Sequence, residues 1–144
     1  MQGKVVLITG GARRVGAAIC RNLHAHGASI MVHYRSSAKE ARALQAELNL
    51  KRTDSVALIQ ADLLNLPMLP NLVGDTVKRF GRLDVVINNA SSFFPTPLGQ
   101  IDAAAWDDLV GTNFKAPLFL AQAAAPYLAE RGGAIVNITD IHAE

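Results

Sequence analysis

The chain has 144 residues, of which half are hydrophobic and 18% are charged. This composition excludes a disordered chain and suffices for the core of one domain, which we expect to span residues 1–144. The formal net charge is +2 without a run of like charges, so no nucleic-acid partner is expected. The single cysteine, Cys20, excludes an internal disulfide, and the four histidines lack the spacing of metal ligands, so no metal is expected.

The sequence gives no sign of a membrane segment. The chain opens directly on strand-like residues, which leaves no room for a signal peptide. Its longest apolar stretch, 116–129, is interrupted by Gln122 and two prolines and is too short to cross a bilayer. We therefore expect a cytoplasmic protein without a membrane partner.

Short β-branched segments alternate with longer helical segments along the chain. The expected strands are Val5–Thr9, Ser29–Tyr34, Ser55–Gln60, Leu83–Asn88 and Ala134–Thr139. The expected helices are Arg13–His26, Ser37–Asn49, Leu69–Phe80 and one long helix from Asp102 to Arg131. This alternation predicts an α/β fold with a doubly wound parallel sheet (Rossmann) in the order 3-2-1-4-5 and helices on both faces. Such folds normally add another strand and helix, so we expect the C-terminal part to be absent.

Several residues mark the ends and faces of these helices. Asp102 is a plausible N-cap, and Gly27 and Gly81 stand where helices commonly end. Ser36 or Ser37 is expected to cap the second helix. In the first helix, Val15, Ile19 and Leu23 recur every four residues and predict its apolar face.

A glycine-rich turn follows the first strand in the run Thr9-Gly10-Gly11-Ala12-Arg13-Arg14-Val15-Gly16. Glycines allow the backbone to approach a pyrophosphate, and the free N–H groups of the helix start attract its charge. The run is closer to Thr-Gly-x-x-x-Gly-x-Gly than to Gly-x-Gly-x-x-Gly, with Arg14 in place of the middle glycine. We predict that Gly10, Arg13, Arg14, Val15 and Gly16 bind a dinucleotide.

The end of the second strand indicates which dinucleotide is bound. It reads His33-Tyr34-Arg35-Ser36-Ser37 and lacks the acidic residue that holds the ribose hydroxyls of an unphosphorylated cofactor. A guanidinium and two hydroxyls, with Arg13 approaching from the glycine turn, fit a 2′-phosphate. All five residues are therefore predicted to contact NADPH. The alternative is that Arg35 and Ser36 form only a solvated cap of the next helix.

The third and fourth strands end in further candidate residues. Asp62, followed by Leu63, is placed to hydrogen-bond an adenine amino group, although helix capping is an alternative role. Asn89 and Ala90 follow the fourth strand, where a small, amide-rich backbone can pass close to a cofactor. The alternative is that the asparagine amides only tie neighbouring loops together. The loop 91–97 then lies at the carboxyl end of a strand, where ligands bind in such sheets.

These motifs resemble the short-chain dehydrogenase/reductase superfamily. The resemblance rests on Thr9-Gly10 with Gly16, Asn88-Asn89-Ala90, Asn113 and the run 135–138. Within the superfamily, pteridine reductases match best. The matching features are Arg13-Arg14, His33-Tyr34, Ser91-Ser92-Phe93, the run 95–98, and Asp140 where a catalytic serine usually stands, with His142 nearby.

The resemblance implies a role for each matching residue. Arg14 would bridge the cofactor phosphate and a pterin, and Ser91 would contact cofactor and substrate. Phe93 would stack on the pterin ring, which fits the preference of a flat heterocycle for an aromatic neighbour. Asp140 would take part in proton delivery, and Asn113 would hold a structural water. Phe93 has an alternative role in a core or lid, and Asp140 as a cap of the next element.

The implied activity is NADPH-dependent reduction of a dihydropterin or dihydrofolate to the tetrahydro form. A carbonyl or 3-oxoacyl reductase is an alternative, weakened because Asp140 replaces the serine that would polarise a carbonyl. A non-catalytic dinucleotide-binding regulator is another, because the family's Tyr-x-x-x-Lys pair is not found before Glu144. The partner is then a small pterin or folate. The resemblance also implies a homotetramer, formed through the long helix and the one that would follow it.

Overall fold

The computed structural model describes residues 1–139. Its centre is a parallel five-stranded sheet in the order β3-β2-β1-β4-β5. The strands are β1 (Val5–Ile8), β2 (Ser29–Tyr34), β3 (Val56–Gln60), β4 (Val85–Asn88) and β5 (Ala134–Asn137). The predicted α/β fold and its strand order are therefore confirmed, and the order reverses between β1 and β4.

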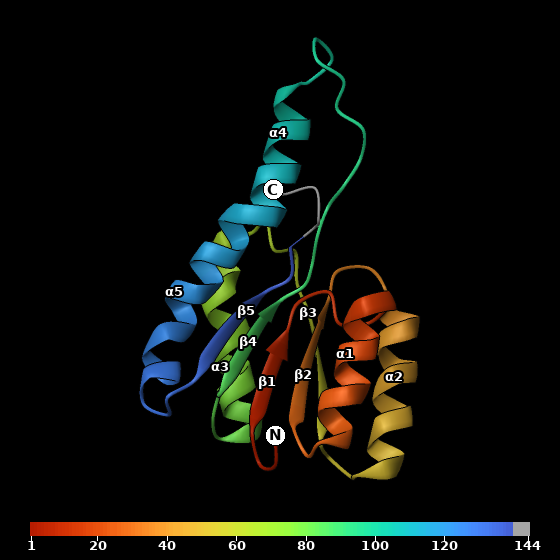
Figure 1. Cartoon of the computed structure of the whole chain (residues 1–144), viewed down its shortest axis with the longest axis vertical. Helices are drawn as coiled ribbons and strands as arrows, with labels where there is room; N and C mark the ends of the chain where they lie inside the picture. Colours follow the sequence, from red (N-terminus) through yellow and green to blue (C-terminus); the bar gives the residue numbers. More distant parts are fainter. Residues whose placement is uncertain (140–144) are drawn as a thin grey trace.

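Helices cover both faces of the sheet (Figure 1). On one face lie α1 (Arg14–Ala25) and α2 (Ala38–Lys51), and on the other lie α3 (Leu69–Phe80) and α5 (Ala116–Ala129). A short 3₁₀ turn, η1 (Leu66–Met68), precedes α3. The eight-residue helix α4 (Ala103–Val110) extends beyond the carboxyl edge of the sheet (Figure 1). No helix in the described part of the chain is long and apolar enough to cross a membrane.

Alternate residues of the central strands feed two separate cores. Val6 and Ile8 of β1 pack beneath α1 and α2, while Leu7 between them packs with α3 and α5. This follows from the two-residue period of a strand and explains why β1 is apolar throughout. β5 differs, because all four of its residues are exposed.

The long helix expected from Asp102 to Arg131 is not one α-helix, and that prediction is wrong. A π-helical segment, η2 (Gly111–Lys115), separates α4 from α5. Pro117 gives the physical reason, because it has no N–H to donate to the carbonyl group four residues earlier. The backbone hydrogen bonds of the helix therefore change from the α-helical to the π-helical spacing before α5 begins.

Most of the predicted helix ends are confirmed. The Asp102 carboxylate accepts a hydrogen bond from the Ala105 N–H at 2.7 Å, and Gly27 and Gly81 adopt φ values of +90° and +77° after their helices. The prediction that a serine side chain caps α2 is wrong. Ser37 occupies the N-cap position with φ −86° and ψ 51°, and its side chain makes no capping hydrogen bond. That backbone conformation lies outside the extended region typical of a capping serine.

A buried carboxylate joins β1 and β4 at the amino edge of the sheet. Asp84 is 2% exposed and accepts hydrogen bonds from the Val5 N–H at 2.9 Å, Arg82 Nε at 2.7 Å and Lys4 Nζ at 3.3 Å. Burial alone would raise the pKa of Asp84, but these hydrogen bonds together lower it below its ordinary value. The ionised Asp84 side chain therefore links the starts of the neighbouring strands β1 and β4.

A buried hydroxyl joins the same two strands at the carboxyl edge. Thr9 Oγ1 accepts from the N–H groups of Asn89 and Ala90, both at 3.0 Å, and donates to the Ile87 carbonyl at 3.4 Å. The Asn89 amide returns across the gap and donates to the carbonyls of Thr9 at 2.9 Å and Gly10 at 3.1 Å. This set of contacts, the Thr9–Asn89 joint, fixes the glycine turn against the end of β4.

We predict that Asp84→Asn lowers the free energy of unfolding by about 1.5–3 kcal/mol at neutral pH, the typical worth of a hydrogen bond to a charged group. Because the folded pKa of Asp84 lies below its unfolded value, its contribution is complete above the unfolded pKa and is lost as the pH falls through the folded pKa. Urea unfolding across the acidic range should show the two proteins converging at the acid end. Asp54→Asn is the control, because Asp54 pairs with Arg79 at an exposed site. An equal loss in both variants at neutral pH would contradict the role given to Asp84.

We also predict that Thr9→Val lowers the free energy of unfolding by about 1–3 kcal/mol, because the partly buried N–H groups of Asn89 and Ala90 lose their acceptor. Thr9→Ser should retain most of the stability. Thr76→Val is the matched control, since the buried Thr76 hydroxyl donates only to the Leu72 carbonyl of its own helix at 2.7 Å. Chemical denaturation of the variants tests this, and equal losses for Thr9→Val and Thr76→Val would show that the joint has no special weight.

Candidate functional site

The predicted cofactor residues come together at the carboxyl edge of the sheet. Because neighbouring parallel strands end at the same edge, the segments after β1, β2, β3 and β4 lie next to one another. Direct contacts join them: the Gly11 N–H donates to the His33 carbonyl at 3.0 Å, and the Ala61 N–H to the Tyr34 carbonyl at 3.2 Å. The edge is thus one continuous surface built from four strand ends.

The glycine turn is packed so closely that side chains are excluded from it. A Cβ at Gly16 would lie 2.5 Å from the Gly10 carbonyl oxygen and 2.7 Å from Asn89 Nδ2. Gly10 has φ +61°, and a Cβ there would lie 2.9 Å from the Ala90 Cα. Two glycines are therefore required for α1 to begin directly against the turn and the end of β4.

The first turn of α1 is free to attract an anion. Its N-cap residue, Arg13, makes no side-chain capping hydrogen bond, and no acidic residue lies in the first turn. Arg14 adopts φ +47°, a left-handed conformation that costs energy for a residue with a side chain. Val15 beside it is 59% exposed. Open helix N–H groups, a strained arginine and an exposed valine are features of a ligand site rather than of a packed turn.

A buried thiol lies beneath the turn. Cys20 Sγ contacts the Gly11 carbonyl oxygen at 3.6 Å, and Cys20 is fully buried. Burial raises the pKa of the Cys20 thiol to about 12. A thiol with so high a pKa stays protonated near neutral pH and is a poor nucleophile, so Cys20 supports the turn and does not react.

His33 is a buried tether rather than an exposed contact. Its Nδ1 accepts a hydrogen bond from the Gly10 N–H at 3.2 Å, so Nε2 carries the proton and donates to the Ala61 carbonyl at 3.1 Å. Burial lowers the pKa of His33 by more than the Ala61 hydrogen bond and nearby Asp62 raise it. The neutral ring therefore connects the glycine turn, β2 and the end of β3.

The residues after β2 present an exposed basic surface. Arg35 and Ser36 are exposed and Ser37 is half-buried, with no capping bond from its hydroxyl. Arg13 is 62% exposed on the facing turn and lies 3.9 Å from Glu40 of α2. The predicted phosphate-binding groups are thus all accessible to a ligand.

Three other predicted residues make local contacts. Tyr34 is buried in a small cluster with Ala12 and Ala41, and Leu63 is buried in the main core. Asp62 is exposed, and its Oδ1 accepts from the Leu64 N–H at 3.0 Å, a local turn contact that resembles the capping alternative. Tyr34 and Leu63 therefore have only main-chain atoms to offer a ligand at this edge.

The loop after β4 is anchored by the π-helical segment. Asn113 Oδ1 accepts from the Ser92 N–H at 3.0 Å, and Asn113 Nδ2 donates to the Ser92 carbonyl at 2.8 Å. Ser91 is exposed, and the Phe93 ring that follows is 91% exposed. The alternative in which Phe93 is a core residue is therefore excluded, and its predicted role in substrate binding stays a prediction. Asp140, the predicted proton-delivery residue, lies outside the described residues.

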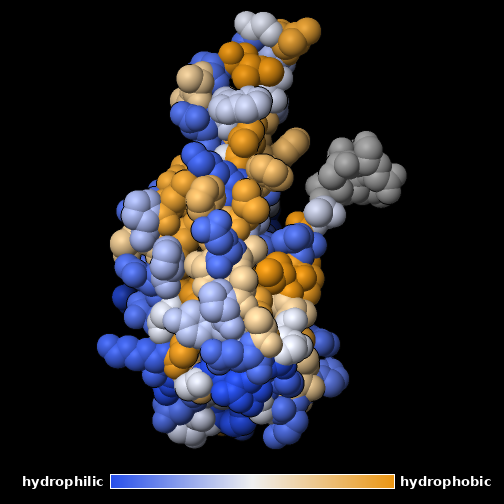
Figure 2. Space-filling view, turned by 90° about the vertical axis from the view of Figure 1, so that its left-hand side faces the viewer, coloured by the Kyte–Doolittle hydropathy of each residue, from blue (hydrophilic) through white to orange (hydrophobic). Residues whose placement is uncertain are grey.

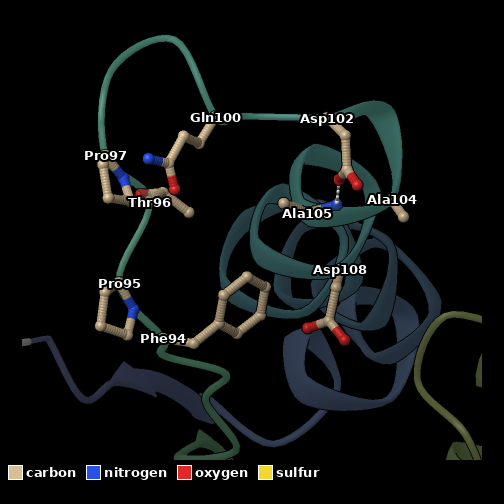
Figure 3. Close-up of a pocket in the computed structure, with 9 residues that line it drawn as sticks. All are labelled: Phe94, Pro95, Thr96, Pro97, Gln100, Asp102, Ala104, Ala105 and Asp108. Carbon is tan, nitrogen blue, oxygen red and sulfur yellow. Dashed lines mark hydrogen bonds between the residues drawn. The ribbon is translucent and has the colours of Figure 1, made fainter.

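An open pocket of about 450 Å³ lies between this loop and α4 (Figure 3). The Phe94 ring and the Asp108 carboxylate point into it, and Pro95 and Pro97 form the wall that faces α4 (Figure 3). Asp108 Oδ1 is buried and has no hydrogen-bond partner among the described residues. The pocket begins at the residue that follows Phe93 in the chain, because Phe94 lines it.

Apolar side chains gather over α4, η2 and α5 on the face shown in Figure 2. The large exposed ones on these elements are Trp106, Phe114, Leu118, Phe119 and Tyr127. Exposed apolar side chains that gather on a surface commonly mark an interaction site.

Several contacts were missed by reasoning from the sequence. Thr9 was recognised in the motif but not as the centre of the joint with Asn89. Asn88 Nδ2 donates to Asn137 Oδ1 at 2.8 Å and joins β4 to β5, which the amide residues at matching strand ends could have indicated. Nothing in the sequence indicated that Glu40 lies near Arg13, because this approach depends on how α2 packs against the rest of the fold. Among residues 1–139, no group of three or more His, Cys, Asp or Glu side chains could hold a metal ion.

Comparison with known proteins shows which proteins this chain is similar to. The family model described as short chain dehydrogenase matches residues 4–144. Pteridine reductase 1 of Leishmania tarentolae is 37% identical, over 94% of this chain and 60% of the relative. The 3-oxoacyl-[acyl-carrier-protein] reductase FabG of Staphylococcus aureus is 34% identical, over 96% and 56%.

A solved structure shares the fold. A mutant short-chain dehydrogenase/reductase from Serratia marcescens is 31% identical, with a TM-score of 0.93, over 99% of this chain and 58% of that one. The chain spans about three fifths of the length of the relatives it matches. Because the family model matches nearly the whole chain, the protein belongs to the short-chain dehydrogenase family.

Proposed function

We propose that the protein takes part in the NADPH-dependent reduction of a dihydropterin or dihydrofolate to its tetrahydro form, as a pteridine reductase. One observation carries the choice of NADPH: the end of β2 presents Arg35, Ser36 and Ser37, without an acid in the run 33–37, and the glycine turn that carries the exposed Arg13 is joined to β2 through Gly11. A carboxylate there would repel a 2′-phosphate, whereas a guanidinium with neighbouring hydroxyls attracts it. The glycine turn, from which side chains are excluded, fits the pyrophosphate.

Each element of the edge has a part in holding the cofactor. The open N–H groups of α1 attract the pyrophosphate, and Arg14 extends the positive charge toward the substrate side. The joint between Thr9 and Asn89 keeps the turn at a fixed distance from β4. When bound, the reduced nicotinamide supplies the hydride.

The substrate side is proposed to lie over the loop after β4. Phe93 offers a free aromatic face to a flat heterocycle, and Ser91 offers a hydroxyl at its edge. Asn113 holds the base of this loop through both main-chain groups of Ser92. Asp140 is proposed to take part in proton delivery.

The comparisons support the family and leave two substrate classes in competition. Identity to the pteridine reductase is 37% and to the 3-oxoacyl reductase 34%, so identity alone does not separate them. The second candidate function is therefore reduction of a carbonyl or 3-oxoacyl substrate. We favour the pterin because Arg14, Phe93 and Asp140 occur together in this chain.

We further propose that residues 1–144 act as one dinucleotide-binding domain in a cytoplasmic protein. A homotetramer is proposed through the helical segment α4 to α5. The exposed Trp106, Phe114 and Leu118 on this segment support an interface there, because burial of apolar side chains drives such association.

The choice of cofactor is tested by Arg35→Gln. We expect the wild type to bind NADPH more tightly than NADH, and the variant to lose about 1.5–3 kcal/mol of NADPH binding, roughly tenfold or more, with little change for NADH. Titration followed by nicotinamide fluorescence measures both. Arg79→Gln is the control, since Arg79 pairs with Asp54 away from the edge. Equal affinity of the wild type for the two dinucleotides would overturn the assignment.

The substrate class is tested by Phe93→Ala in the full-length enzyme. Loss of ring stacking should weaken dihydrobiopterin binding by roughly 0.5–1.5 kcal/mol, with little change in NADPH affinity. Leu50→Ala is the control, because Leu50 is an apolar residue that is 89% exposed near the end of α2, outside the proposed interface. Steady-state kinetics with dihydrobiopterin and with a 3-oxoacyl thioester separate the candidates. A variant that keeps its pterin kinetics but loses 3-oxoacyl reduction would establish the second candidate instead.

A further inference from the structure

A groove of about 370 Å³ runs between α1 and α2, beside the predicted phosphate site. Two ion pairs cross it at successive positions: Arg13 with Glu40 at 3.9 Å, and Arg21 with Glu47 at 2.7 Å. All four side chains are among those that line the groove. The groove therefore has two glutamates on its α2 wall, and each of them faces an arginine on the opposite wall.

The two pairs differ in how firmly the arginine is held. Glu47 binds Arg21 through both carboxylate oxygens, with contacts of 3.0, 3.0 and 2.7 Å. This pairing raises the pKa of Arg21 and lowers that of Glu47. Arg13 has a single contact with Glu40 at 3.9 Å, and the two side chains are 62% and 46% exposed. Arg13 is thus held loosely and remains available to another anion.

Glu40 lies close to the site proposed for the 2′-phosphate. It stands in the first turn of α2, three residues after Ser37. Ala12 of the glycine turn packs with Tyr34 and Ala41, so the turn that carries Arg13 and the start of α2 are in contact. A phosphate held by Arg13 and Arg35 would therefore have the Glu40 carboxylate as a neighbour of the same charge.

We propose that Glu40 is a specificity-determining residue that competes with the 2′-phosphate of the dinucleotide for Arg13. This inference rests on the proposed use of NADPH. Without ligand, Glu40 partly neutralises Arg13. To bind Arg13, the phosphate must displace Glu40 from the guanidinium, and this displacement is the main cost that Glu40 imposes. Glu40 therefore lowers the preference for a phosphorylated dinucleotide below what the arginines alone would give, and so favours release of the cofactor.

The test uses the full chain and two probes that differ only in the phosphate: adenosine 2′,5′-bisphosphate and 5′-AMP, each titrated by calorimetry. Glu40→Gln should raise the affinity for the bisphosphate roughly two- to fivefold, the range expected for loss of an exposed ion pair. Affinity for 5′-AMP should stay within about twofold. The gain should shrink at high salt, because exposed charges are screened.

Glu47→Gln is the matched control. It removes a carboxylate from the same helix and the same groove, two turns further along α2. This variant should leave the binding of both probes unchanged. A double-mutant cycle with Arg13→Gln completes the design: the gain from Glu40→Gln should largely disappear when Arg13 is already replaced.

Each outcome supports or overturns the inference. Weaker or unchanged bisphosphate binding in Glu40→Gln, or an equal gain in Glu47→Gln, would overturn it while leaving the proposed NADPH site intact. If Glu40→Gln still raises the bisphosphate affinity when Arg13 is already replaced by Gln, the proposed competition between Glu40 and the phosphate for Arg13 is wrong. If the wild type shows no preference for the bisphosphate over 5′-AMP, the proposed NADPH specificity fails and the role of Glu40 fails with it.

Discussion

The contact between the Thr9 hydroxyl and the two N–H groups after β4 is the constraint on which the rest of the site depends. Parallel strands place their carboxyl ends at one edge but do not fix the spacing of the loops that follow. Thr9 and Asn89 supply that spacing across the point where the strand order reverses. The close packing of Gly16 against Gly10 and Asn89 is a consequence, and it brings the start of α1 to the same place.

The buried and exposed polar groups of this edge have separate tasks. Thr9, His33 and Asn89 are turned inward and bind backbone groups of neighbouring segments, so they hold the framework. Arg13 and Arg35 are turned outward and make few contacts that would fix them. A rigid frame with accessible charges is suited to a ligand that is held by its phosphates. The fold already orders the backbone of the site, so binding loses less conformational entropy.

Much of the fold could be predicted because local signals and the global architecture agree. The apolar runs of β1 and β2, the glycines at the ends of α1 and α3, and the Asp102 cap all report local physics that survives in the folded chain. The same holds for the candidate site, since the end of each central strand can be located from the sequence and all of them meet at one edge.

The errors arose where packing overrides local pattern. Of the three residues spaced four apart in α1, Ile19 and Leu23 pack against the core as predicted, but Val15 is exposed. The buried face of the helix includes Gly16, Cys20 and His24. The close approach at Gly16 rotates that face toward the turn. The break at η2 is different, because Pro117 at the start of α5 lacks an N–H and was a local signal for it in the sequence. The approach of Glu40 to Arg13 depends on the packing of α2, which no local signal reports.

We propose that this edge holds a 2′-phosphorylated dinucleotide across the ends of β1, β2 and β4. A crystal structure of the full chain with NADP⁺ tests it most directly. In that structure the pyrophosphate should lie over residues 10–16, and the 2′-phosphate should contact Arg13 and Arg35. A dinucleotide bound at another surface, or a 2′-phosphate that touches neither arginine, would contradict it.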